Sequence, residues 1–393
     1  MDEQRTQAPS ALGADPVKAG RLIIDVSSVP AKPAGAGRYA MALVSRLSQV
    51  GPGFKLAAKR SDLGFWKGLS GADVIISAPD RRPLRVIWEQ TRLASQLNMS
   101  QVGIYHGIHY TIPRNYAGKT VVTLHDTTMI EHPEWHQSVK VRYFSRAIDF
   151  AIARADVIIV PSRFTKAKLE QHFGKMDKVV PIHHGVDHDR FFPSARGKAN
   201  NPGNRLAAEL PNRFLLHIGT IEPRKNIGNL IEAFDEVARR DEEIALVLVG
   251  QKGWKSDAIY SRLQASPFSD RIRVFGYLSE NDLQAVLTAA SCVVYPSFAE
   301  GFGLPVLEAM AAGIPVVTSK DSVMEEIALG AGWYCDPLDP GEIAEKIESA
   351  IYGSEQALSK VTLGIARSRE FTWEKSALEH LEVYRSLGFE LGD

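Results

Sequence analysis

One short segment, residues 292–317, restricts the fold of this chain more than any other part of the sequence. It begins with the apolar run 292–295, which has the length and composition of a buried strand in a parallel sheet. A loop with two glycines follows, and then an expected helix with a proline near its first turn. Gly313 and Pro315 end that helix, and the apolar pair 316–317 starts the next strand. This order of strand, helix and strand predicts an open α/β sheet.

The same alternation runs through both halves of the chain. At 393 residues the sequence is too long for one core of ordinary size, so two domains are expected. The repeated strand–helix order predicts two doubly wound domains with parallel sheets. The expected strands, with the loops that end some of them, lie at residues 21–26, 73–77, 121–124, 156–160, 179–182, 214–220, 245–250, 271–278, 292–295 and 316–317.

The composition is that of a soluble globular protein, with 45% apolar and 23% charged residues. No run of about 18 apolar residues occurs, so we expect no membrane-spanning helix. The first 19 residues are polar and contain no apolar stretch, which predicts a loose tail and not a signal peptide. Cys292 and Cys335 are too few for a disulfide framework or a structural zinc site. A reducing, cytoplasmic compartment is therefore expected.

The charges are divided unequally between the two halves, although the formal net charge of the chain is zero. Residues 20–186 contain 23 Lys and Arg against 12 Asp and Glu, a balance of +11. Residues 187–393 contain 21 against 31, a balance of −10. The two domains are thus expected to have different partners, and helix dipoles must hold an anionic ligand in the second half.

Two glutamates, Glu300 and Glu308, bracket the loop between the strand at 292–295 and its helix. In an open α/β sheet, ligands lie at the carboxyl ends of the strands, where this loop begins. Gly301 and Gly303 allow the backbone to approach a bound group, and the helix start offers unpaired N–H donors to an anion. We expect Glu300 to point into the cleft and Glu308 to reach ribose hydroxyls. The plain alternative is a solvated helix with two acids.

The Glu-x7-Glu spacing, with Gly-Phe-Gly-x-Pro inside it, resembles the signature of glycosyltransferase family 4. The resemblance implies retaining transfer from a nucleotide sugar and the GT-B fold, in which two Rossmann-like domains face a cleft and the C-terminal helix crosses back to the first domain. It also assigns Phe302 and Leu304 to the donor site. The implied division is a tail at 1–19, an acceptor-side domain at 20–190, a hinge and linker at 191–212, a donor domain at 213–370 and the returning helix at 371–393.

Two further elements of the second half resemble the donor site of this family. Arg224 and Lys225 follow the strand and loop at 214–220 and lie at an expected helix start, where they can hold a diphosphate. Charge-assisted hydrogen bonds of this kind contribute about 1.5–3 kcal/mol each. A solvated Arg-Lys pair is the alternative. The resemblance favours donor binding, with Thr220 in the loop and Tyr277 as a stacking partner for the base.

Gly35 and Gly37 belong to a Gly-x-Gly-x-x-Ala stretch that also matches the dinucleotide fingerprint. However, these glycines lie well past the strand at 21–26, and the strand candidate at 56–58 ends in two basic residues with no acid for a ribose. A simple turn at a helix start remains open. The family resemblance implies that Gly37 presents its backbone N–H to the donor diphosphate.

Histidines follow two expected strands of the first half. His125 lies at the carboxyl end of the strand at 121–124, and Asp126 either orients its ring or caps the next segment. A purely structural His-Asp pair is the alternative, whereas the resemblance implies that His125 approaches the donor sugar. Weaker candidates for acceptor binding are His106, His109 and Tyr110.

Together these residues predict a retaining glycosyltransferase. No metal ion is expected, because two cations and helix dipoles can stabilise a leaving diphosphate. Residues 88–90 and 125–128 resemble the bacterial polysaccharide mannosyltransferases, which implies GDP-mannose as donor and a glycan or polyprenyl-diphosphate-linked acceptor. The residues expected to act in catalysis are His125, Glu300, Arg224 and Lys225.

Three alternatives remain open: a UDP-glucose or UDP-galactose transferase, an NAD(P)-dependent dehydrogenase, and a non-catalytic nucleotide-sugar binder. His184 and Met324 depart from the family pattern, which limits assignment to a subfamily. No nucleic acid partner is expected. The basic, amphipathic stretch around Lys140, Arg142 and Arg146 predicts contact with an anionic membrane at its inner face.

Overall fold

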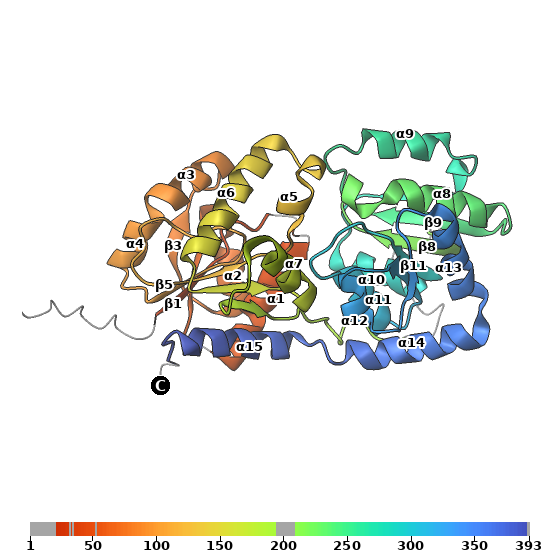
Figure 1. Ribbon diagram of the computed structural model, residues 1–393. Coiled ribbons are helices and arrows are strands. Elements are labelled where there is room, and N and C mark those ends of the chain that lie inside the picture. Colours follow the sequence, from red (N-terminus) through yellow and green to blue (C-terminus); the bar gives the residue numbers. More distant parts are fainter. Residues whose placement is uncertain (1–20, 31–32, 34, 52, 194–208, 391–393) are drawn as a thin grey trace, which may run out of the picture.

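The computed structural model describes residues 21–30, 33, 35–51, 53–193 and 209–390. The predicted tail at 1–19 and most of the predicted linker at 191–212 lie outside these residues. Figure 1 shows two lobes side by side, with α14 (Ser354–Ser368) along the second lobe and α15 (Trp373–Ser386) along the first. Within the described residues, no helix is both long enough and apolar enough to cross a membrane.

The first lobe is built on a seven-stranded parallel sheet with the order β3-β2-β1-β4-β5-β6-β7. Its strands are β1 (Leu22–Asp25), β2 (Lys55–Lys59), β3 (Val74–Ala78), β4 (Ile104–Gly107), β5 (Lys119–Thr123), β6 (Val157–Val160) and β7 (Val179–Pro181). Its helices are α1 (Gly35–Val50), α2 (Leu63–Ser70), α3 (Arg82–Thr91), α4 (Leu93–Met99), α5 (Thr128–Glu131), α6 (Ser138–Arg154) and α7 (Arg163–Phe173). One face of the sheet packs on α1, α2 and α15, and the other on α3, α4, α6 and α7.

The second lobe repeats this plan with a six-stranded sheet of order β10-β9-β8-β11-β12-β13. Its strands are β8 (Arg213–Ile218), β9 (Ile244–Val249), β10 (Ile272–Phe275), β11 (Cys292–Tyr295), β12 (Val316–Ser319) and β13 (Trp333–Cys335). Its helices are α8 (Ile227–Ala238), α9 (Asp257–Ala265), α10 (Glu280–Ala289), α11 (Leu304–Ala311), α12 (Val323–Ala328) and α13 (Pro340–Tyr352). All strand pairs are parallel and covered on both faces, which confirms the predicted pair of doubly wound domains.

The last helix, α15, packs against α1 of the first lobe, as predicted. Where the chain passes between the lobes, Val186 pairs with Thr372. A side chain at Gly185 would bring its Cβ to 2.1 Å from the backbone nitrogen of Trp373. The two crossing segments are therefore in direct backbone contact, which requires glycine at this position.

A buried polar network attaches α15 to the first sheet. His106 of β4 hydrogen-bonds the Tyr384 hydroxyl through Nδ1 (2.7 Å) and Thr123 Oγ1 through Nε2 (2.8 Å). The Tyr39 hydroxyl joins Thr123 (3.0 Å) to His380 of α15 (2.8 Å). Burial lowers the pKa of His106 well below its usual range, so the ring is neutral. The prediction that His106 lines an acceptor cleft is wrong, because its ring is needed inside the core to hold α15.

The lobes also meet at the N-terminus of α7, in a set of contacts that we call the interlobe clasp. The N–H groups of residues 163 and 164 donate to the Glu326 carboxylate of α12 (2.9 and 2.8 Å). The carbonyl of Gly301 accepts from the Ser162 and Thr165 hydroxyls (2.8 and 3.1 Å). A helix start has unpaired N–H donors and the positive end of its dipole, so an acid from the other lobe is stabilised there.

We predict that Tyr384→Phe destabilises the protein. The substitution leaves Nδ1 of His106 buried without its partner, which costs about 1–3 kcal/mol. The urea unfolding midpoint should fall relative to that of Tyr260→Phe, since the Tyr260 hydroxyl makes no hydrogen bond to another described residue. Equal midpoints for the two variants would contradict the role of this network.

We predict that Gly301→Ala separates the lobes. A Cβ at this position would lie 1.6 Å from the carbonyl oxygen of His125. Because this oxygen belongs to the backbone, it cannot move aside as the end of a flexible side chain can. Small-angle X-ray scattering should give a larger radius of gyration than for the wild type. Gly228→Ala is the control, because the nearest atom to its Cβ is Arg262 Cδ at 3.8 Å. An unchanged radius for Gly301→Ala would refute this contact.

Candidate functional site

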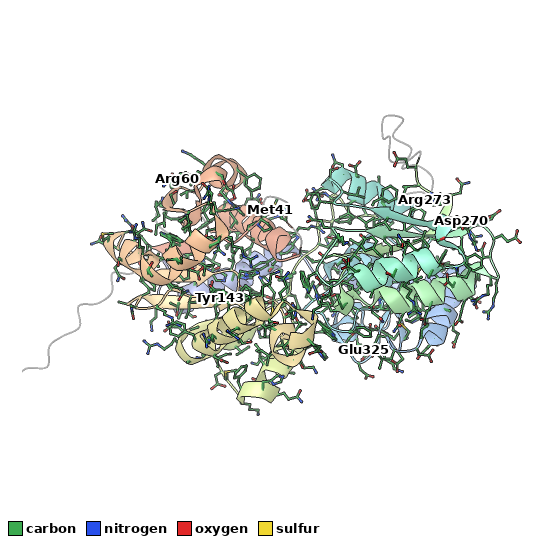
Figure 2. The ribbon with its side chains drawn as sticks, turned by 90° about the horizontal axis from the view of Figure 1, so that it is seen from above. Met41, Arg60, Tyr143, Asp270, Arg273 and Glu325 are labelled. Atoms are coloured by element: carbon green, nitrogen blue, oxygen red, sulfur yellow. The ribbon has the colours of Figure 1, made fainter. Side chains whose placement is uncertain are left out.

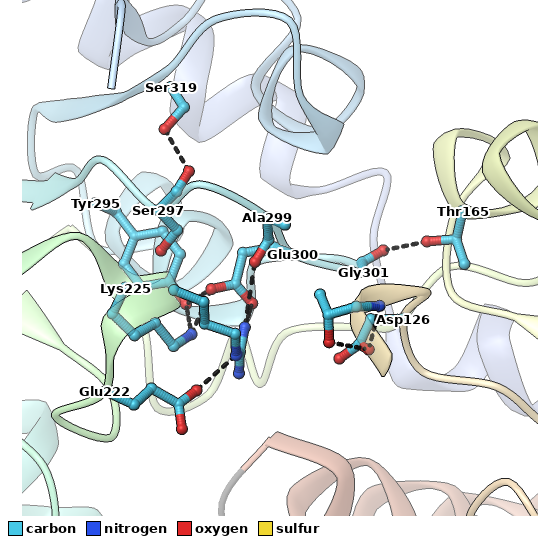
Figure 3. A network of polar contacts seen from close by, with 12 residues as sticks. Asp126, Thr165, Glu222, Lys225, Tyr295, Ser297, Ala299, Glu300, Gly301 and Ser319 are labelled. Atoms are coloured by element: carbon cyan, nitrogen blue, oxygen red, sulfur yellow. Dashed lines mark hydrogen bonds and ion pairs between the residues drawn. The ribbon is translucent and has the colours of Figure 1, made fainter. Parts of the chain in front are cut away.

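Two cations and two acids form a buried cluster at the carboxyl edge of the second sheet (Figure 3). Arg224 and Lys225 come from a short 3-10 helix after β8, and Glu300 follows β11. Arg224 Nη1 lies 2.8 Å from Glu300 Oε2, and its Nε lies 2.5 Å from Glu222 Oε1. Lys225 Nζ contacts Glu300 Oε1 and lies 2.5 Å from the Tyr295 hydroxyl. The sequence predicted three of these residues and missed Glu222 and Tyr295.

The charges of this cluster depend on one another. Burial by itself would raise the pKa of Glu300, but Arg224 and Lys225 outweigh burial and lower that pKa to about 2. Burial and the neighbouring Arg224 lower the pKa of Lys225. Burial also raises the pKa of Glu222, whose carboxylate pairs with Arg224. Glu300 is thus ionised at neutral pH and holds two cations beside each other, an arrangement suited to an anionic ligand.

The glycines after Glu300 approach protein atoms. Gly301 lies against the His125 carbonyl, and a Cβ at Gly303 would come within 2.6 Å of the Met324 side chain. Gly303 has φ +101° and precedes the first residue of α11. That Gly301 and Gly303 allow the backbone to approach a bound group stays a prediction, and packing within the protein already requires glycine at both positions.

The other two loop residues assigned to the donor site are buried. Phe302 packs its ring against His184 (4.8 Å between centroids) and Phe371 (6.0 Å). Leu304 begins α11 and is also buried. The Phe302 side chain therefore packs beside the two crossing segments, whereas Leu304, although buried, lines a cavity beside α1.

His125 lies opposite this loop, in a cage of aromatic rings. Its Nε2 donates to the carbonyl of Ile108 (2.8 Å), so the proton is on Nε2. Burial lowers the pKa of His125 and keeps the ring neutral. Asp126 does not orient this ring, because its Oδ1 accepts from the N–H (3.1 Å) and hydroxyl (2.7 Å) of Thr128. Of the two roles that the sequence left open for Asp126, the structure therefore supports capping.

His109 and Tyr110 form part of that cage. The His109 ring packs against Phe144 and His125, and burial lowers its pKa to about 3. The Tyr110 hydroxyl accepts the N–H of Asp126 (3.0 Å). Both residues thus surround His125, and any contact with an acceptor would be made beside it.

An ion pair that the sequence analysis did not single out joins the lobes. Arg38 Nη2 lies 2.5 Å from Glu308 Oε1, and both side chains line a cavity of 300 Å³ between α1 and α11. A Cβ at Gly37 would lie 2.7 Å from Pro33, so this glycine packs on the preceding loop. The sequence does contain a signal that could have identified Arg38, because it is a cation of the basic half that directly follows Gly37.

The remaining donor candidates flank this region. Tyr277 lies after β10, near Arg38. Thr220 lies in the loop after β8, where its methyl group faces Gly253. In the part of the chain that the structure describes, no three His, Cys, Asp or Glu side chains are grouped so that they could hold a metal ion.

Comparison with known proteins covers both lobes. The family model described as "Glycosyltransferase Family 4" matches residues 33–190, and the one described as "Glycosyl transferases group 1" matches residues 204–360. The chain is 28% identical over 376 residues to the O-antigen chain mannosyltransferase B of Escherichia coli, covering 90% of this chain and 96% of that protein.

Solved structures have the same fold. Sucrose-phosphate synthase from Thermosynechococcus elongatus superposes with a TM-score of 0.75 at 20% identity, covering 94% of this chain and 99% of that one. Anabaena Alr3699/HepE, solved in complex with UDP-glucose, gives a TM-score of 0.74 at 16% identity, covering 93% and 99%. The two matched domains, the two facing sheets and the Glu-x7-Glu loop agree, and the chain belongs to glycosyltransferase family 4, in a branch similar to the bacterial polysaccharide mannosyltransferases.

Proposed function

We propose that the protein is a retaining hexosyltransferase that moves mannose from GDP-mannose to a glycan during polysaccharide biosynthesis. The observation that carries this proposal is the pair of buried cations, Arg224 and Lys225, held by Glu300 at the carboxyl edge of the second sheet. Similarity to the O-antigen chain mannosyltransferase supports mannose as the sugar. The UDP-glucose complex of the structurally similar HepE is the reason to keep UDP-glucose as the second candidate.

In the proposed reaction, the bond between the anomeric carbon and a diphosphate oxygen breaks while the acceptor hydroxyl attacks from the same face. The acceptor proton passes to the leaving phosphate oxygen, so no protein base is required. Negative charge grows on the diphosphate, where Arg224 and Lys225 stabilise it. The start of α11 and the Gly37 loop add N–H dipoles. These groups can replace a metal ion, and we propose none.

Three side chains would act on the rest of the donor. His125 is neutral, so its ring does not oppose the positive charge that develops on the sugar. Glu300 retains lone pairs beyond those used by its cations and can accept from sugar hydroxyls. Glu308, buried in α11, would bind the ribose. In this arrangement the two cations bind the diphosphate, and the neutral or acidic side chains contact the sugar and the ribose.

We predict that Lys225→Ala abolishes most donor binding. It removes a charge-assisted contact of about 1.5–3 kcal/mol and leaves Glu300 with one cation fewer. GDP-mannose should raise the melting temperature of the wild type and of the control Lys346→Ala, whose cation pairs with Glu345 on α13, but not that of Lys225→Ala. Transfer to a glycan acceptor should retain the anomeric configuration and continue in EDTA.

Each of the other possible outcomes leads to a different conclusion. Stabilisation and transfer only with UDP-glucose or UDP-galactose would replace the proposed donor. Stabilisation without transfer to any acceptor would make the protein a nucleotide-sugar binder. Loss of transfer in EDTA, restored by magnesium or manganese, would overturn the metal-free mechanism. Wild-type kinetics in Lys225→Ala would mean that the donor site lies elsewhere.

For the acceptor, we propose a polyprenyl-diphosphate-linked glycan at an anionic membrane surface. Exposed Arg142 and Arg146 of α6 line a cavity of 570 Å³ together with Arg114. The exposed apolar side chain of Val139 lines the same cavity, and α3, whose Gln90 also lines it, carries the exposed Leu84 and Ile87. Lys140 takes no part, because its Nζ lies 4.6 Å above the Trp254 ring of the second lobe. Cations beside exposed apolar groups suit a lipid interface, where each contributes about 1 kcal/mol.

We predict that the protein sediments with anionic vesicles and remains in the supernatant with neutral ones. Binding should weaken at high salt and in Arg142→Glu/Arg146→Glu. The control Arg60→Glu/Lys67→Glu makes the same charge change around α2, with Arg60 and the α6 residue Tyr143 on different sides of the first lobe (Figure 2). If the same amount of protein stays in the supernatant with both vesicle types at low salt, the positive charge of α6 does not serve membrane binding.

A further inference from the structure

The ion pair between Arg38 and Glu308 leaves its acid only half satisfied. Glu308 is 3% exposed at its side chain and Arg38 is 22% exposed. Arg38 Nη2 contacts Glu308 Oε1, whereas the buried Oε2 has no hydrogen-bond partner among the described residues. A guanidinium can bind both oxygens of a carboxylate with two parallel N–H groups. This pair uses one oxygen, so the carboxylate of Glu308, a residue that lines the cavity, has an unused acceptor.

A carboxylate with an unused acceptor oxygen can accept hydrogen bonds from hydroxyl groups of a ligand. Two adjacent hydroxyls, as in a ribose, donate one hydrogen bond to each oxygen of a single carboxylate. Arg38 contacts Oε1, Oε2 is buried and the Glu308 side chain is 3% exposed, so a ribose diol reaches both oxygens only if Arg38 moves aside. A buried ion pair of this kind is costly to break without replacement. A ribose diol and Arg38 therefore compete for Glu308, and full binding of the diol requires Arg38 to find another anion.

The surroundings of Arg38 indicate which anion. The residue lies in the first turn of α1, directly after Gly37, in a lobe whose charge balance is +11. On the facing lobe, Leu304 at the start of α11 lines the same cavity. One residue from the first turn of each helix, Arg38 of α1 and Leu304 of α11, lines this space, so a diphosphate entering it would lie near two N-terminal dipoles and a released guanidinium.

We propose that Arg38 is a specificity-determining residue that exchanges Glu308 for the donor diphosphate. Ribose hydroxyls take over Glu308, and Arg38 turns to the phosphates, so a nucleoside without phosphates must displace Arg38 with no compensation. The site thereby disfavours nucleosides relative to nucleoside diphosphates. This inference rests on the proposed function of the cleft as the donor site.

The exchange predicts opposite effects of one substitution on two ligands. In Arg38→Gln, calorimetry should give a dissociation constant for guanosine about threefold lower than in the wild type, because the competitor for Glu308 is weakened. The constant for GDP should rise about tenfold, because a charge-assisted contact is lost. The gain should be smaller for 2′-deoxyguanosine, which lacks one of the two hydroxyls. Uridine and UDP serve as the second pair of probes.

Two further variants make the result specific. Arg46→Gln removes a cation of the same helix and cavity, whose side chain hydrogen-bonds Gln49 and no other residue that the structure describes. This variant should leave the ratio of the two constants unchanged. Arg38→Lys keeps the charge and should restore most of the GDP affinity if Arg38→Gln folds poorly.

The outcomes separate the inference from the proposed function. If Arg38→Gln weakens both ligands together, or if Arg46→Gln has the same effect as Arg38→Gln, the exchange is overturned while the donor site stands. If the wild type binds none of guanosine, GDP, uridine and UDP, the donor site itself is overturned and the exchange with it.

Discussion

The candidate site depends on a backbone contact in which Gly301 of the second lobe lies against the carbonyl of His125 in the first. Each sheet presents its functional side chains at its carboxyl edge, and neither edge forms a complete site alone. Because Gly301 has no side chain, the loop that follows Glu300 can approach the backbone of His125 in the other lobe. The interlobe clasp around α7 holds the same loop from its other side.

The unequal division of charge has an explanation within the molecule. The balances of +11 and −10 predict different partners for the two domains. In the structure, part of the asymmetry is used between the lobes, where Glu308 and Glu326 of the acidic half meet Arg38 and the start of α7. Glu280 pairs with Arg190 beside the same cavity (2.7 Å). Opposite charges on facing surfaces favour approach of the lobes, and salt should weaken that attraction.

Three buried histidines are held as neutral rings inside the protein. Burial lowers the pKa values of His106, His125 and His184. His106 attaches the last helix, His125 faces the loop of Gly301, and the ring of His184 stacks on Trp373 at the crossing segments. A chain of neutral rings thus runs from the hinge to the site. These rings connect the crossing segments to His125 without adding positive charge there.

The sequence by itself determined the architecture and most of the second-lobe site. Apolar runs of strand length, repeated between amphipathic helices, allow little except two parallel sheets, and short-range order places Arg224, Lys225 and Glu300 at strand ends. Such features are local, so they can be read along the chain. The family resemblance added the returning helix, which no local pattern specifies.

Only the tertiary structure decided what each polar residue contacts. His106 and His109 look alike as loop histidines, yet one holds a helix inside the core and the other packs beside His125. The reason that Gly301 is glycine, and the pairing of Arg38 with Glu308, depend on atoms more than 170 positions apart in the chain. Contacts between two independently folded lobes follow from how their surfaces meet, and no periodicity or spacing in the sequence records that geometry.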